Sequence, residues 1–171
     1  VSYFMLATQD VCRSEGAQLG VELRRVLQER DLLDLQAAAL AAGFAGTQEY
    51  EDQGYATAID WMRFNCHLTS TAAADLIAVG KNLHRLAESI QAAANGEIGF
   101  AHVKAMARTA NAVGSKFDEA LLLEKARDNS AGKFYFICNH YRHSADPGGF
   151  EAEQKALGEN RKLWISTRED G

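Results

Sequence analysis

The sequence predicts an all-α protein, an orthogonal multi-helix bundle of about six or seven helices that contains a helix-turn-helix-like segment. Apolar residues recur at intervals of three and four along most of the chain. Pro147 is the single proline among 171 residues, so little in the sequence breaks long helices. With 47% apolar and 24% charged residues, the composition is that of a globular protein. We therefore expect one helical domain across residues 1–171.

The first predicted helix is long and covers residues 8–44, with a break expected near Gly16–Gly20. Its apolar stripe repeats at alternating intervals of four and three, and Arg30 is its one polar member. We expect the stripe to pack in the protein's own core, although this spacing is also typical of a coiled-coil seam. The stripe consists of Leu19, Leu23, Val26, Leu33, Ala37, Leu40 and Phe44.

A polar loop is expected over residues 46–54, before a short helix that ends near Cys66. Thr57 and Asp60 have the spacing of a capping box, in which each side chain bonds a free backbone N–H of the first turn. The apolar residues that we expect to bury this helix are Ile59, Trp61, Met62 and Phe64.

The helix-turn-helix-like segment covers residues 69–113. Thr69 begins its first helix, whose inward stripe includes Gly80. Glycine costs a helix about 1 kcal/mol against alanine, so we expect another backbone to approach closely at this position. The turn lies at 95–99. The inward residues of the second helix are predicted to be Phe100, Val103, Met106, Ala110 and Val113.

Further helices are expected across residues 116–160. Ser115 has the spacing of a second capping box, and Ser130 suits the cap of a later helix. A turn is predicted at 146–149 and a strand at 163–167. The later helix should bury Phe134, Ile137, Cys138 and Tyr141. Because the chain stops just after this strand-like segment, we expect it to be part of a longer protein.

The net charge of −5 disfavours a nonspecific grip on the phosphate backbone of DNA. The charge is uneven, however. Residues 69–116 hold five Lys/Arg against three Asp/Glu, a balance of +2, while both flanking parts are acidic. The middle of the chain is therefore the part whose charge permits nucleic-acid binding.

The cysteines and the hydropathy pattern indicate a cytoplasmic protein. The three cysteines are odd in number and far apart, unlike those of a secreted disulfide scaffold, so we expect reduced thiols. No apolar run approaches the roughly 20 residues that cross a bilayer, so no membrane contact is predicted.

No motif in the chain predicts catalysis or metal binding. Cys138, His140 and His143 lie close in sequence, but on a helix Cys138 is about 200° away from His140, so one metal ion cannot take all three. The Asn139-His140 pair lies in a helical region without the hairpin of a His-Asn-His nuclease. No nucleophile elbow or glycine-rich phosphate loop is present. We therefore expect no catalytic residue, no metal and no cofactor.

The second helix of the helix-turn-helix-like segment carries residue types that suit DNA. Lys104, Arg108 and Asn111 follow i, i+4, i+7 spacing and share a helix face. Lysine and arginine suit phosphates and guanine, and asparagine suits adenine. The alternative is the solvated polar face that any helical bundle needs. The candidate DNA-binding residues are His102, Lys104, Arg108, Asn111, Lys81 and Arg85.

Several short features recur in order along the chain: a glycine and a hydroxyl residue before a tryptophan, a Leu-Thr helix start, and a Gly-Glu-Ile turn before a histidine. They lie at positions 54–62, Leu68-Thr69, Ala72, Gly80, Leu83, Leu86, 94–98 and His102-Val103. In these features the chain resembles the bacterial domain of unknown function 222 family. The resemblance covers about residues 15–171, and its specific part is 54–110.

The resemblance implies that this chain is the non-catalytic part of a protein that also contains an enzyme domain. Members of the family are often the N-terminal part of proteins whose C-terminal part is an HNH endonuclease, and the nuclease residues lie in that other part. Our first hypothesis is therefore a non-catalytic module that binds or positions double-stranded DNA. The alternative is a protein-interaction module, for instance a homodimer built on the 19–44 helix, with no nucleic-acid contact.

Overall fold

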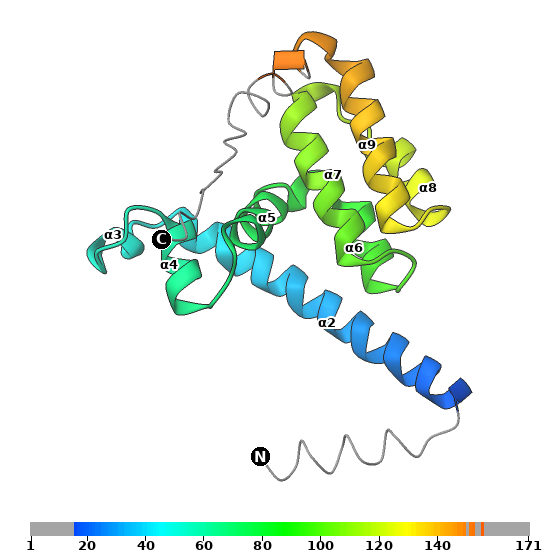
Figure 1. Cartoon of the computed structure of the whole chain (residues 1–171), viewed down its shortest axis with the longest axis horizontal. Helices are drawn as coiled ribbons and strands as arrows, with labels where there is room; N and C mark the ends of the chain where they lie inside the picture. Colours follow the sequence, from blue (N-terminus) through cyan, green and yellow to red (C-terminus); the bar gives the residue numbers. More distant parts are fainter. Residues whose placement is uncertain (1–15, 150, 153–154, 156–171) are drawn as a thin grey trace, which may run out of the picture.

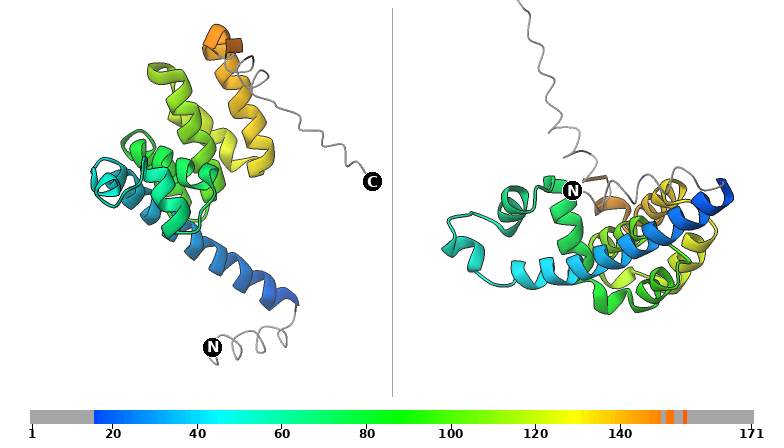
Figure 2. Two further views of the ribbon diagram at one scale, coloured as in Figure 1. Left: turned by 60° about the vertical axis from the view of Figure 1, so that its left-hand side comes forward. Right: turned by 90° about the horizontal axis from the view of Figure 1, so that it is seen from below.

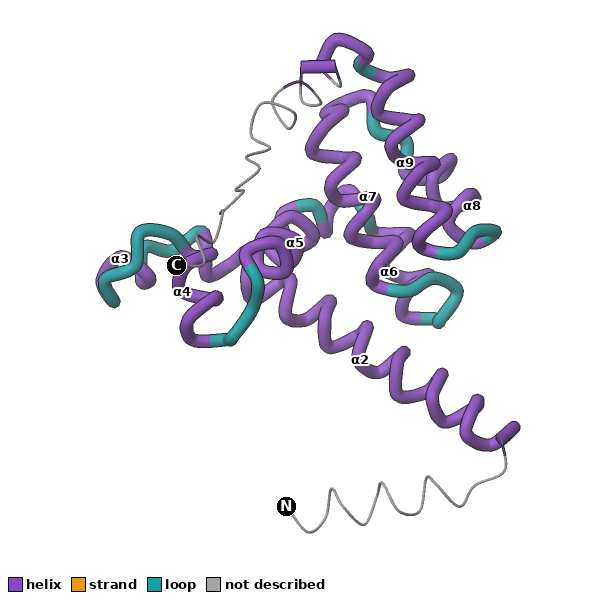
Figure 3. The backbone as a smooth tube through the Cα atoms, viewed as in Figure 1, coloured by secondary structure: helices purple, strands orange, loops and turns teal. Residues whose placement is uncertain are grey.

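The computed structural model describes residues 16–149, 151–152 and 155, and in this part of the chain it is an all-helical bundle without strands (Figures 1 and 3). The predicted fold class is thus confirmed. The predicted strand at 163–167 and residues 8–15 of the first helix lie outside the described residues. The α-helices are α2 Gly16–Ala45, α3 Glu49–Asp52, α4 Ala58–Asn65, α5 Ser70–Lys81, α6 Ala87–Ala94, α7 Phe100–Val113, α8 Glu119–Arg127 and α9 Ala131–Ala145, and the 3-10 helices are Leu83–Arg85 and Gly114–Lys116.

Helix α2 crosses α5 at very short range, as the glycine on the stripe of α5 predicted. A Cβ atom built at Gly80 would lie 2.0 Å from the carbonyl oxygen of Ala38 and 2.5 Å from the Cβ of Ala42. The two backbones can approach this closely only because these positions carry the smallest side chains.

The inward face of α2 differs from the one predicted. The buried residues of the helix are Leu35, Ala38 and Ala41, whereas Leu33 and Leu40 of the predicted stripe are 63% and 75% exposed. The helix also runs without a break through Gly20, and its N-terminal half extends beyond the other helices (Figures 1 and 2). Alanines lie on the inner face because their small side chains permit the close crossing with α5.

The helix predicted to continue from Thr69 to the turn at residue 95 is broken in the structure. Helix α5 ends at Lys81, and a 3-10 turn separates it from α6. Buried Asn82 stabilises the break, because its amide donates to the carbonyl of Ala78 at 2.8 Å and to Asn111 Oδ1 at 2.7 Å. An asparagine that bonds its own helix's last carbonyls competes with helix continuation.

Helix α7 lies at the centre of the bundle, in contact with α5, α6, α8 and α9 (Figure 1). All five residues predicted to face inward on α7 are buried. Three of them, Phe100, Val103 and Met106, belong to the main core together with residues of the neighbouring helices, among them Leu86, Leu122, Phe134 and Cys138. The prediction succeeded because the 3.6-residue period of α7 carries a single apolar stripe.

Most predicted caps are present. The side-chain oxygens of Thr57, Thr69 and Ser130 accept backbone N–H groups at the starts of α4, α5 and α9. The box predicted at Ser115 is wrong, since Ser115 lies in a 3-10 turn and Asp118 caps α8 instead, accepting from Leu121 N at 3.0 Å. A carboxylate at the N-cap also suits the positive end of the helix dipole.

Three further expectations were wrong in detail. The loop at 46–54 contains the short helix α3. Phe64 of α4, expected inside, is 65% exposed. Residues 147–149, predicted as a turn, are helical, because the Asp146 carboxylate accepts the N–H of Gly149 at 3.3 Å and proline suits a first helical turn.

Candidate nucleic-acid interface

Three of the six predicted DNA-binding residues share the one exposed strip of α7. Lys104, Arg108 and Asn111 lie on the side of the helix that its buried residues leave open, and the side chains of Lys104 and Arg108 are 36% and 43% exposed. Most of the remaining residues of α7 are buried, so this strip is its most accessible surface among the described residues.

A buried carboxylate from α5 pairs with both cations. Arg108 donates from Nε to Asp75 Oδ1 at 2.7 Å, and its Nη2 lies 2.6 Å from the same oxygen. Lys104 Nζ lies 3.7 Å from Asp75 Oδ2. Only 8% of the Asp75 side chain is exposed, so this carboxylate needs its partners to offset its desolvation. The cluster as a whole keeps one positive charge.

The exposed strip of α7 forms one wall of a groove, and α9 forms the other. Arg108 and Asn111 face Tyr135, Asn139 and Arg142 across a hollow of about 520 Å³. We call this hollow the α7–α9 groove.

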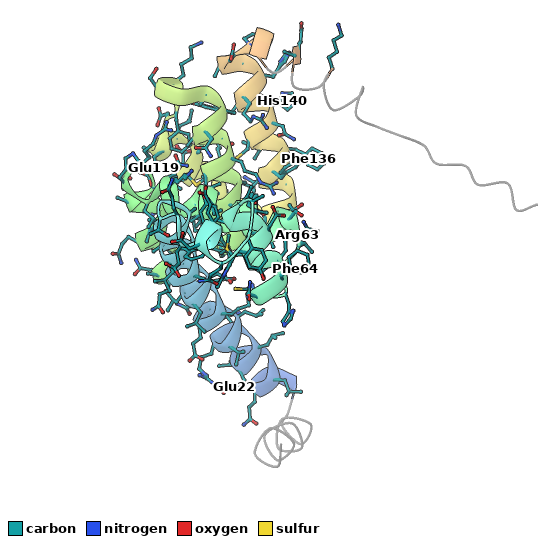
Figure 4. All side chains as sticks on the ribbon, turned by 90° about the vertical axis from the view of Figure 1, so that its left-hand side faces the viewer. Glu22, Arg63, Phe64, Glu119, Phe136 and His140 are labelled. Atoms are coloured by element: carbon teal, nitrogen blue, oxygen red, sulfur yellow. The ribbon has the colours of Figure 1, made fainter. Side chains whose placement is uncertain are left out.

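A smaller hollow of about 180 Å³ continues the groove toward α5. Its lining adds Asp75 and Lys104, and it shares Arg108 and Tyr135 with the larger hollow. The two hollows together present cationic, amide and phenol groups along the length of α7. Phe136 and His140 lie beside the groove on the outer side of α9 (Figure 4).

The two helices that form the groove contain no acidic residue. Helix α7 carries Lys104 and Arg108, and α9 carries Lys133 and Arg142, while neither has an Asp or Glu. This is a concentration of positive charge in a chain with a net charge of −5. Asp75 is the one carboxylate among the described residues that line either hollow.

Arg85 stabilises the C-terminal end of α7 and does not face the groove. It donates from Nη1 to Ala110 O at 2.8 Å and from Nη2 to Gly114 O, and its guanidinium lies 5.2 Å from the centre of the Phe117 ring. Both carbonyls also accept a backbone N–H, from Gly114 and Phe117, so Arg85 gives each a second, charged donor. Lys81 is exposed in the last turn of α5 and lines neither hollow.

His102 joins the start of α7 to the segment before α9. Its Nδ1 accepts the N–H of Gly99 at 3.3 Å, so Nε2 carries the proton and donates to Asn129 O at 2.9 Å. Its ring also packs against Phe134, with 5.5 Å between ring centres. These contacts use both ring nitrogens, and His102 is therefore a positioning residue for the helix.

Helix α2 covers the turn between α6 and α7. Gln28 donates from its amide to Ala94 O at 3.1 Å, and Asp31 accepts the N–H of Phe100 at 3.1 Å. The carboxylate of Asp31 occupies the positive end of α7. In a DNA-reading helix-turn-helix this end of the second helix meets the base edges. Here the accessible part of α7 is instead its middle and C-terminal half.

Sequence reasoning missed Asp75, Asn139 and Arg142, because the groove joins segments about 30 residues apart. One signal was present in the sequence: residues 131–145 contain two Lys/Arg and no acid. The same segment also carries four aromatic residues, Phe134, Tyr135, Phe136 and Tyr141.

The described residues hold no group of three His, Cys, Asp or Glu side chains arranged to bind a metal ion. Cys138 is buried, whereas His140 and His143 are exposed. No described helix is long and apolar enough to cross a membrane.

Comparisons of the chain with protein-family models, with curated proteins and with solved structures find no match. The resemblance to the domain of unknown function 222 family therefore remains an expectation based on the motifs.

Proposed function

We propose that this chain is a non-catalytic module that binds double-stranded DNA through the α7–α9 groove. The observation that carries the proposal is that Lys104, Arg108 and Asn111 form one wall of a groove whose other wall carries Asn139 and Arg142. Guanidinium and ammonium groups on both walls suit phosphate oxygens. We extend the proposal to a cytoplasmic, bacterial HNH-endonuclease-like parent protein on the strength of the motif resemblance.

The geometry favours positioning DNA over reading its sequence. The N–H of Phe100, the first residue of α7, donates to Asp31 of α2, so this carboxylate occupies the helix end at which a DNA-reading helix meets base edges. The cations lie farther along the helix, beside α9. Contacts of this kind bind the DNA backbone and fix its position without distinguishing bases.

A substitution of Asp75 tests whether DNA binds at the groove. Because it pairs with Lys104 and Arg108, it competes with a phosphate for the same two cations. Asp75→Asn removes the negative charge and keeps an oxygen that can accept from Arg108. We expect this variant to bind DNA more tightly, with a salt slope steeper by about 0.9 for each phosphate gained.

The experiment is fluorescence anisotropy of a labelled duplex at several salt concentrations, for the wild type and for charge-matched variants. Glu124→Gln is the control, since it also removes one carboxylate that pairs with a cation, Lys125, but on the exposed surface of α8. Asp75→Asn combined with Arg108→Gln removes the pair without leaving an unpaired buried carboxylate, and should bind more weakly than Asp75→Asn alone. Absence of wild-type binding at low salt, or an equal gain from Glu124→Gln, refutes the proposal.

The second candidate function, a protein-interaction module built on the 19–44 helix, rests on a separate observation. Most of the large apolar residues on the predicted stripe of α2 are exposed, among them Leu23, Leu33 and Leu40. This surface lies on a different element from the groove, so the two functions are compatible.

A further inference from the structure

Helix α2 has two apolar faces, and the bundle uses only one of them. Leu35 and Ala38 face α5 and the core, and Ala42 lies at the Gly80 crossing. Away from this face, Val26 is 49% exposed, Leu33 63% and Leu40 75%, and Leu23, 60% exposed, lies at its edge beside the α6–α7 turn. Leaving a leucine in water instead of burying it forgoes about 1.5–3 kcal/mol, so a stripe of this length is a costly surface for a monomer.

The spacing of the exposed stripe is that of a coiled-coil seam. From Leu19 to Leu40 its positions alternate at intervals of four and three, a mean period of 3.5 residues. The stripe continues along the N-terminal half of α2, which extends beyond the bundle toward Glu22 (Figures 1 and 4). In residues 16–27 every side chain is exposed except half-buried Leu19. The surface is thus elongated and suits another helix.

The charges on α2 identify the orientation in which the stripe is complementary to itself. In a parallel pair Arg30 would face Arg30 across the seam, and the flanking Glu29 would face Asp34 of the other helix. Both contacts repel. In an antiparallel pair Arg30 lies opposite Leu33, and Glu29 faces the uncharged Gln36.

The antiparallel register also matches the apolar residues. When Arg30 lies opposite Leu33, Leu23 lies opposite Leu40, and Val26 lies opposite Ala37. Every large exposed residue of the stripe except Leu33, which meets the aliphatic stem of Arg30, thereby gains an apolar partner.

We propose that the exposed stripe of α2 is a homodimer interface, in which α2 of one copy packs antiparallel on α2 of a second copy. The bundle packs on the Leu35 and Ala38 face of each helix, and the exposed side chains of Val26, Leu33 and Leu40 lie away from it. The proposal is independent of DNA binding, because the α7–α9 groove uses other helices.

The oligomeric state is measured by sedimentation equilibrium of the full chain from micromolar to millimolar concentration. We expect a dimer that Leu33→Gln combined with Leu40→Gln converts to a monomer, with unchanged helical circular dichroism because both side chains are already exposed. Leu121→Gln, which changes a 43% exposed leucine of α8, is the matched control and should leave the dimer intact. A wild-type monomer at all concentrations overturns the proposal, as does a dimer that survives the double change.

Disulfide cross-linking tests the orientation. In a background with Cys12→Ser and Cys66→Ser, Leu23→Cys together with Leu40→Cys should give a covalent dimer under oxidation, whereas each change alone should not. Cross-linking by Leu23→Cys alone would demonstrate a parallel pair and overturn the antiparallel arrangement.

Arg30 supplies an independent check of the seam. Arg30→Leu replaces the one polar residue of the stripe and should tighten the dimer by at least about tenfold, since each copy then buries one more leucine. Unchanged or weaker association would place Arg30 outside the interface and contradict the register.

Discussion

The closest helix crossing in the bundle depends on the absence of a side chain at Gly80. In an exposed helix, a change from glycine to alanine stabilises by about 1 kcal/mol, because alanine loses less backbone entropy on folding. At Gly80 the new Cβ would lie 2.0 Å from Ala38 O and 2.8 Å from Ala38 C. These are backbone atoms, so the clash is relieved only if α2 and α5 separate.

The expected effect of Gly80→Ala is the sum of these opposing contributions. Overpacking typically costs about 1–3 kcal/mol, and the upper value applies here because two backbones must move. Against the gain of about 1 kcal/mol in helix propensity, the net loss is about 2 kcal/mol. For a domain of this size the midpoint of thermal unfolding should fall by about 6 °C.

The assay is urea unfolding followed by circular dichroism, with Gly20→Ala as the control. Gly20 lies in α2 with nothing within 4 Å of an added Cβ, so this change should raise the unfolding midpoint. Both variants should keep the wild-type dependence on urea. If Gly80→Ala is as stable as Gly20→Ala, the close crossing of α2 and α5 is refuted.

Three further predictions concern single side chains. Arg85→Ala should lower the unfolding free energy by about 1–3 kcal/mol, measured in urea, because two carbonyls at the end of α7 lose a charged donor and the Phe117 ring loses its guanidinium contact. In a Cys12→Ser chain at pH 8, a maleimide should label exposed Cys66 rapidly and Cys138 only on unfolding, because burial raises the pKa of Cys138 to about 11. Burial raises the pKa of Asp34, so its ionised carboxylate weakens the fold as the pH rises above the ordinary pKa of an aspartate. In thermal scans, Asp34→Asn should therefore stabilise the fold at pH 7 and not at pH 3. An equal effect at both pH values would contradict this reasoning.

Local sequence signals predicted the starts of α4, α5 and α9. Thr57, Thr69 and Ser130 cap the helices they were expected to cap, because a cap is a bond between residues two or three positions apart. Gly80 was correctly predicted as a point of close approach, since a glycine on an apolar helix stripe costs stability that a second backbone packed against it can restore.

The candidate site was predicted only in part. The shared face of Lys104, Arg108 and Asn111 follows from helix geometry, and the structure places all three at the groove. The roles of Arg85 and His102 were not predictable, because their partners are carbonyl groups 25 or more residues away. The pairing of Asp75 with Arg108 spans 33 residues and has no local signal.

By itself the sequence determined that the described part of the chain is helical, where α4, α5, α7 and α9 begin and which residues of α7 face inward, since all of these depend on periods and bonds within one helix. Only the tertiary structure decided which face of α2 the bundle covers. Both faces are apolar, and hydropathy alone favours the one with the larger residues, Leu33 and Leu40. The bundle packs on the alanine face of α2, because Ala38 and Ala42 allow α2 to approach Gly80 closely. Steric fit between two helices therefore outweighed hydrophobicity, and left a second apolar stripe exposed.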